Sequence, residues 1–168
     1  MGCREFQVIK QIPAEDFDTP ELTRQEYVRM LQTAKILEDE RAYVLTKLFA
    51  TTGIAVLDLS AVTVEAVQTG HAVLKSGKKL EIVRFPASLQ ADLLRYAREN
   101  GHPSGMIFTK KDGSAIARTQ VSLFIQKLAQ EAKVPAEKGN IRALRQLYKT
   151  TISGIEANFD LLVRQAYE

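Results

Sequence analysis

The side chains best suited to chemistry in this sequence lie in residues 140–151, where basic and apolar residues recur at helical spacing. Arg142, Arg145 and Lys149 would lie along one part of a helix surface. An adjoining stripe would carry Leu144, Leu147 and Tyr148. Guanidinium groups hold phosphate oxygens in a fixed two-pronged geometry, so such a surface suits a polyanion. The alternative interpretation is a solvated helix face, which is the more common role of such charges.

Four further basic residues extend this candidate surface. Two short runs, residues 71–75 and 79–85, flank Ser76-Gly77-Lys78 and predict a β-hairpin. Its tip would carry Lys75, Lys78 and Lys79, although lysines at a hairpin turn most often only keep a protein soluble. Arg118 stands just ahead of another predicted helix. We expect these side chains to join the basic helix in binding an anion.

Composition limits the kinds of function. A chain of 168 residues with 45% hydrophobic residues can bury one sizeable core, so one domain is expected. One cysteine, Cys3, excludes an internal disulfide framework and a cysteine zinc site, and two histidines give little support to a metal site. We therefore expect no metal or cofactor. The net charge is −4 over residues 1–70 and +7 over residues 71–168, so the second part is the expected anion-binding surface.

The sequence gives no sign of export or of a membrane anchor. No apolar run approaches the roughly 18 residues that a transmembrane helix needs. The amino terminus carries Arg4, Glu5 and Lys10, where a signal peptide would need a continuous apolar stretch. The expected compartment is the cytoplasm, with no membrane partner.

Local signals predict a mostly helical chain. Residues 1–21 contain two prolines and an acidic cluster, and are expected to form an extended arm or linker. Thr23 and Glu26 form a capping box that should begin a helix. A second helix is expected from Glu40 to Thr51, with Gly53 as its stop and a restarted helix directly afterwards.

The second half continues in the same manner. After Pro86 a helix is expected, and residues 106–109 predict a third short strand. Thr119 is the expected cap of the following helix, which should end before Pro135. The basic helix of residues 140–151 comes next, and residues 156–168 predict a separate amphipathic helix at the end.

From about Leu22 to the end, the order of these pieces resembles the catalytic domain of tyrosine recombinases, the phage-integrase family. The matching pieces are the start at residues 22–27, the segment at residues 50–58, the lysine-bearing hairpin, residues 106–109 followed by Gly113, and Leu144-Arg145. The resemblance implies an α+β, mainly α, integrase-like catalytic domain over residues 22–168, with a small antiparallel hairpin or three-stranded sheet packed on helices. It also implies double-stranded DNA as the partner.

Family members cleave DNA by attack of a tyrosine on a phosphodiester, so the resemblance also implies a set of site residues. Arg145 matches the second catalytic arginine, and Lys75 or Lys78 would take the place of the lysine that protonates the leaving oxygen. Ala55 stands where the family has its first arginine, and Arg142 stands where it has a histidine. Two further departures are Gln146, in place of a second histidine, and the end of the chain before the expected nucleophilic tyrosine. Neither Tyr148 nor Tyr167 matches that tyrosine.

Three functions remain open on this reading. The first is a DNA-binding, recombinase-like domain that no longer cleaves DNA, with phosphate contacts from Lys75, Lys78, Lys79, Arg118, Arg142, Arg145 and Lys149. The second is a fragment of an active recombinase whose missing residues come from outside this chain. The third is a protein-interaction module that kept the scaffold and uses the last helix, residues 159–163, for docking or self-association.

Overall fold

The computed structural model describes residues 21–167, without the side chains at positions 76, 153, 156–159 and 167. Almost all of the predicted arm at residues 1–21 lies outside this range. The elements are the helices α3 (Arg24–Ile36) and α4 (Glu40–Thr52), the 3-10 helix η1 (Val56–Ala61), helix α5 (Val64–Thr69), the strands β1 (His71–Ser76) and β2 (Lys79–Arg84), and the helices α6 (Ala87–Glu99), α7 (Arg118–Glu131) and α8 (Ile141–Tyr167). The predicted class, mainly α with a small β-hairpin, is confirmed.

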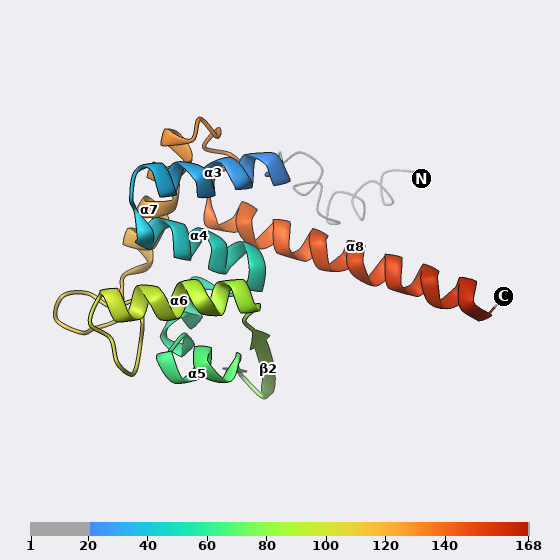
Figure 1. Ribbon diagram of the computed structural model, residues 1–168, viewed down its shortest axis with the longest axis horizontal. Helices are drawn as coiled ribbons and strands as arrows, with labels where there is room; N and C mark the ends of the chain where they lie inside the picture. Colours follow the sequence, from blue (N-terminus) through green and yellow to red (C-terminus); the bar gives the residue numbers. More distant parts are fainter. Residues whose placement is uncertain (1–20, 168) are drawn as a thin grey trace, which may run out of the picture.

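Helix α4 lies at the centre of the fold and contacts α3, α6, α7 and α8 (Figure 1). Nine of its thirteen residues are buried, so it is surrounded by other elements instead of presenting one apolar stripe. Leu45, Leu48 and Phe49 are fully buried and form the middle of the core together with Leu144 of α8. This packing fixes the first turns of α8 against the end of α4.

The capping box predicted at the start of α3 is confirmed. The Glu26 amide donates to the Thr23 hydroxyl at 3.1 Å, and the Glu26 carboxylate accepts from the Thr23 amide at 3.0 Å. Lys138, from the segment between α7 and α8, lies 3.3 Å from the same carboxylate. The hydrogen bond from the Thr23 backbone, followed by contacts with the Thr23 hydroxyl and Lys138, holds the pKa of Glu26 below its usual value.

Replacing Glu26 by glutamine should therefore weaken the pH dependence of stability. A carboxyl whose pKa is lowered by folding stabilises the fold above its unfolded pKa, and this stabilisation is lost as the pH falls through the folded pKa. We expect Glu26→Gln to cost about 0.5–1 kcal/mol at neutral pH and to reduce the loss of stability between about pH 5 and pH 3. Urea unfolding followed by circular dichroism at several pH values measures this. The control is Glu131→Gln, because Glu131 is exposed. Parallel pH profiles for Glu26→Gln and the unaltered chain would contradict the prediction.

The predicted hairpin is present as an antiparallel pair in which Val73 faces Ile82 and Leu74 faces Glu81. It packs through β1 on α5 and η1. Side chains alternate between the two faces of a strand, so Leu74 is buried on the inner face whereas Val73 and Lys75 are exposed on the outer one. The hairpin thus turns one face toward the helices and the other away from them.

The prediction of a third strand at residues 106–109 is wrong, because the part of the chain that the structure describes forms no strand there. Only two isolated bridges occur there, Thr63 with Met106 and Thr109 with Ala115, and the sheet has two strands. Beside Thr63, the amide of Val64 donates to the Gly105 carbonyl at 2.9 Å and the amide of Ile107 donates to the Val62 carbonyl at 3.2 Å. The apolar residues of this stretch become buried, with Ile107 1% exposed, without a continuous ladder.

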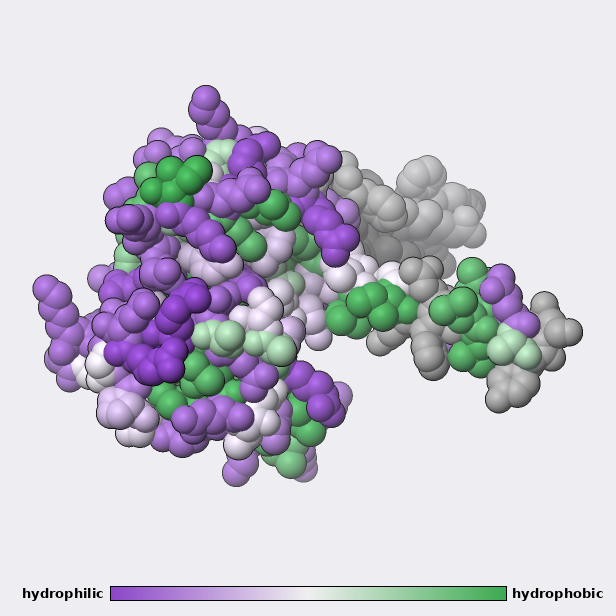
Figure 2. Space-filling model, in the orientation of Figure 1, coloured by the Kyte–Doolittle hydropathy of each residue, from purple (hydrophilic) through white to green (hydrophobic). Residues whose placement is uncertain are grey.

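The two helices expected at residues 140–151 and 156–168 are one helix, α8. A glycine inside a helix costs only about 1 kcal/mol, and a Cβ at Gly154 would meet open space, so this position does not end the helix. The last turns of α8 project away from the rest of the fold (Figure 1). Apolar side chains are visible on this projecting part (Figure 2), where Leu161 and Leu162 are 54% and 63% exposed. Among the described residues, no helix has both the length and the apolar character needed to span a bilayer.

Candidate functional site

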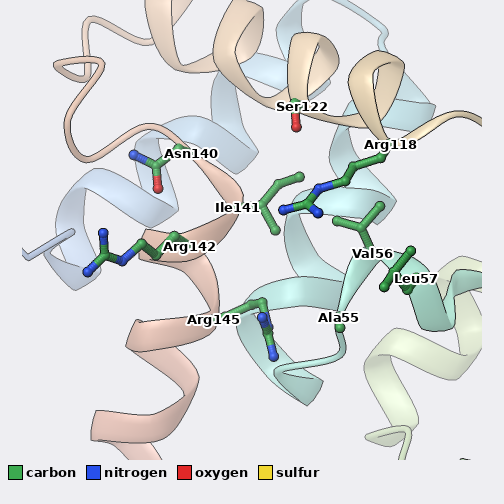
Figure 3. A pocket seen from close by; sticks show the side chains of 9 residues that line it. All are labelled: Ala55, Val56, Leu57, Arg118, Ser122, Asn140, Ile141, Arg142 and Arg145. Atoms are coloured by element: carbon green, nitrogen blue, oxygen red, sulfur yellow. The ribbon is translucent and has the colours of Figure 1, made fainter.

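An open pocket of about 420 Å³ lies where the first turns of α7 and α8 meet the segment after α4 (Figure 3). The residues that line it are Ala55, Val56, Leu57, Arg118, Ser122, Asn140, Ile141, Arg142 and Arg145. Three of these side chains are guanidinium groups, and none of the nine is a carboxylate. This uncompensated positive charge makes the pocket the strongest candidate site among the described residues.

Arg145 is held in place by a backbone contact from a distant part of the chain. Its Nε donates to the Gly53 carbonyl at 3.0 Å, which ties α8 to the turn that ends α4. The side chain is half-buried. Nε is used in this bond, which leaves the two terminal amino groups of the guanidinium as donors for a ligand. Arg145 is therefore positioned before any ligand arrives.

The turn at Gly53 can approach α8 this closely because it lacks a side chain. Gly53 has φ +67°, the left-handed region that favours glycine, and its amide donates to the Phe49 carbonyl at 3.0 Å. A Cβ built at this position would overlap Cδ1 of Tyr148 and lie 2.9 Å from its Cε1. The ring of Tyr148 thus fills the space beside Gly53, one turn of helix beyond Arg145.

Ala55, two residues after Gly53, lies in extended backbone (φ −80°, ψ 152°) ahead of η1. The segment after Gly53 therefore continues as a six-residue 3-10 helix, where the sequence predicted a restarted helix. Ala55 borders the first pocket with Arg145, and both residues also border a second pocket nearby. The position at which the family resemblance implies an arginine thus lies beside Arg145 and carries only a methyl group.

Arg118 and Arg142 come from the first turns of α7 and α8, and both are exposed. The predicted cap at Thr119 is wrong, because α7 begins at Arg118 and its cap position is Ala117, which makes no side-chain capping bond. In Figure 3 the Arg118 side chain extends from α7 toward the pocket, whereas the Arg142 guanidinium points away from Ala55. Arg142 therefore lies at the rim.

Two polar lining residues were not among the predicted site residues. Asn140 accepts from the Ala143 amide at 2.8 Å and donates to the Ala136 and Glu137 carbonyls, so it caps α8 and fixes the preceding loop. An asparagine ahead of an apolar helical run is a recognisable capping signal. Ser122 lies four residues after Arg118 on α7, and this i, i+4 spacing could have placed it on the same side of the helix.

A second pocket, of about 510 Å³, lies between the inner face of the hairpin and α8. Arg145 and Lys149 border it together with Asp58 and Glu81, so both signs of charge are present. Lys75, Lys78 and Lys79 border neither this pocket nor the first one. The structure thus brings Ala55, Arg118, Arg142 and Arg145 together, connects Lys149 to them through Arg145, and leaves the three hairpin lysines outside both pockets.

The clearly shifted pKa values of the described residues belong to other regions. Burial raises the pKa of the Tyr27 hydroxyl. Hydrogen bonds from Ser114 lower the pKa of the Asp112 carboxyl in the turn before α7. In residues 21–167, no three His, Cys, Asp or Glu side chains gather as ligands for a metal ion. The charge of the pocket at Arg145 comes from its three arginines.

Solved structures share this fold, although no protein-family model and no curated protein matches the sequence. XerA recombinase is similar with a TM-score of 0.68 and 20% identity, over 80% of this chain and 50% of that chain. XerH site-specific recombinase, in a pre-cleavage complex with its difH substrate, is similar with a TM-score of 0.68 and 18% identity, over 84% of this chain and 44% of that chain. Lambda integrase bound to DNA has a TM-score of 0.58 and 17% identity, over 76% of this chain and 49% of that chain.

The chain therefore has a tyrosine-recombinase or integrase-like fold, as its sequence resemblance implied. It spans about half the length of the solved structures that it matches.

Proposed function

We propose that this chain is a DNA-binding, integrase-like domain of a site-specific recombination system that does not itself cleave DNA. The observation that carries the proposal is the shared pocket of Arg145 and Ala55, in a fold found in DNA-bound recombinases. A pocket with three guanidinium groups suits a phosphate of the DNA backbone. A methyl group at position 55 removes one donor for the charge that develops during cleavage, and such a donor contributes about 2.7–4 kcal/mol.

The remaining basic residues would position the duplex. Arg118, Arg142 and Lys149 are exposed around the pocket, and Lys75, Lys78 and Lys79 are exposed on the hairpin. Contacts from such residues to phosphates fix the orientation of a protein on DNA without reading its sequence. Residues 22–168 would form this one domain, residues 1–21 would link it to a neighbouring domain, and the protein would act in the cytoplasm.

We expect this chain to bind double-stranded DNA with a strong dependence on salt. The three arginines of the pocket alone would give a slope of about −2.7 in log affinity against log salt, which is about a 40-fold loss between 50 and 200 mM, and further phosphate contacts would make the slope steeper. Fluorescence anisotropy with a labelled duplex of arbitrary sequence measures this. An affinity that is equal at both salt concentrations, or no binding at 50 mM salt, would contradict the proposal.

A second candidate is a fragment of an active tyrosine recombinase that forms a phosphotyrosyl-DNA intermediate. Its support is the pocket itself, because Arg145 keeps a position beside the turn that carries Ala55. A nicked suicide duplex distinguishes the two candidates when it is offered to a longer chain that supplies the missing residues, since it traps a covalent protein–DNA adduct. We expect no adduct with the longer chain, and Ala55→Arg in that chain is the control; an adduct with the unaltered longer chain would support the second candidate.

A third candidate is a protein-interaction module that does not use DNA. It is favoured by the projecting end of α8, where Ile155, Leu161 and Leu162 are 59%, 54% and 63% exposed. Such side chains would be covered by docking on a partner or on a second copy of the chain. Sedimentation of the chain alone would then show a dimer, and a duplex would not bind.

A further inference from the structure

The space over Ala55 has a guanidinium group on two sides. Arg145 reaches it from α8 and is held by the Gly53 carbonyl. Arg118 extends toward the same pocket from α7 (Figure 3). The two arginines are separated by 27 positions in the sequence, and the packing of α7 and α8 brings both to the pocket wall. Ala55, whose side chain is only a methyl group, lines the same pocket together with Val56 and Ile141.

Helix stability does not explain an arginine at position 118. It is the first residue of α7, where the partial positive charge of the helix dipole opposes a cation. The first turn of α7 contains no acidic residue, and no side chain caps it. Within residues 21–167, the Arg118 side chain makes no hydrogen bond or ion pair with another side chain or with the backbone. Its position becomes favourable when an anion lies in the pocket.

The start of α8 has the same unbalanced charge. Its first turn also lacks an acidic residue, and Arg142 is its second residue. The Asn140 side chain caps this helix and holds the preceding loop, and as a neutral amide it adds no negative charge to balance the arginines. Two helix starts thus border one pocket, with Arg118 at its wall and Arg142 at its rim, and no carboxylate is among the lining residues.

We propose that Arg118 supplies, from α7, the guanidinium group that position 55 lacks, so that Arg118 and Arg145 together hold one phosphate group over Ala55. This inference rests on the proposed function for its ligand, a phosphate of a DNA backbone. Arg118 is thus a binding residue at the wall of the pocket, and Arg142 supports it from the rim. An arginine at position 55 would occupy the same space and make Arg118 redundant.

Duplex binding by a set of variants tests the inference. The set is Arg118→Gln, Ala55→Arg and the double variant, with Lys127→Gln as control because Lys127 is exposed on the same helix but does not line the pocket. Arg118→Gln should weaken binding about 10-fold and make the salt slope shallower by about 0.9. The double variant should recover most of this loss, and Lys127→Gln should bind as the unaltered chain does. Equal losses for Arg118→Gln and Lys127→Gln would overturn the inference.

A titration with inorganic pyrophosphate separates this inference from the proposed function. The side-chain Nε–H signals of Arg118 and Arg145 should shift in NMR spectra of the chain, and the shift of Arg145 should shrink in Arg118→Gln. If pyrophosphate gives these shifts and no duplex binds, the proposed function fails while the anion pocket stands. If a duplex binds and Arg118→Gln changes neither affinity nor the NMR titration, the inference fails while the proposed function stands. Because Arg118 is exposed, circular dichroism should show the same fold in Arg118→Gln.

Discussion

Replacing Gly53 by alanine is expected to destabilise this protein by about 2–4 kcal/mol. Gly53 has φ +67°, and an added side chain costs about 1 kcal/mol in this backbone region. The new methyl group would also overlap the ring of Tyr148, and overpacking of this kind costs about 1–3 kcal/mol. The strain would act at the contact between α4 and α8, which joins the central helix to the helix that carries Arg145.

A matched glycine separates the two causes. Gly101 has φ +73°, and a Cβ built there meets nothing within 4 Å, so Gly101→Ala should cost only about 1 kcal/mol. In a Tyr148→Leu background, Gly53→Ala should become about 1–2 kcal/mol less costly than in the unaltered chain. Urea unfolding of the unaltered chain, the three single variants and the Gly53→Ala, Tyr148→Leu double variant gives these values. Equal costs for Gly53→Ala and Gly101→Ala would mean that the Tyr148 contact is not the cause.

Capping signals and apolar periodicity were sufficient to predict most of the helices. The two capping hydrogen bonds between Thr23 and Glu26 join residues three positions apart, so the start of α3 follows from local sequence. Gly53 likewise ended α4 as predicted. Such local interactions require no knowledge of distant parts of the chain.

The errors arose where distant contacts or weak local preferences decide the structure. The stretch at residues 106–109 pairs with Thr63 and Ala115 by single bridges, and no local signal tells such bridges from a strand. Two separate helices were predicted at residues 140–151 and 156–168, but α8 continues through both, because a helix tolerates the modest cost of a glycine at position 154. At Thr119 a hydroxyl predicted the cap, whereas the backbone begins α7 one residue earlier.

The candidate site could be predicted in its composition but not in its arrangement. Arg142, Arg145 and Lys149 were visible as one basic helix face. That Arg118 reaches the same pocket depends on how α7 packs beside α8, and the sequence spacing of the two helices does not encode this. The hairpin lysines were expected to join the basic helix, but they lie outside both pockets. Strand alternation places Lys75 with exposed Val73 on the outer face of the hairpin.

Removal of the Arg145 guanidinium is expected to have the largest effect on DNA binding. Under the proposed function, Arg145→Gln should weaken duplex affinity about 10- to 100-fold, because hydrogen bonds from a charged donor contribute about 1.5–3 kcal/mol. Arg145→Lys should also bind more weakly than the unaltered chain. A lysine cannot donate to the Gly53 carbonyl and still present a planar pair of donors to a phosphate.

The exposed Arg98 on α6 provides a control with the same change of charge. If binding depends on the pocket, Arg98→Gln should change the affinity less than twofold at 100 mM salt, whereas Arg145→Gln should also make the salt slope shallower by about 0.9. Loss of the bond to Gly53 should lower stability by only about 1 kcal/mol, so anisotropy can be measured well below the unfolding temperature. Comparable losses for Arg98→Gln and Arg145→Gln would mean that net charge alone attracts the duplex. In that case the pocket beside Ala55 would have no special part in holding DNA, even though the fold remains integrase-like.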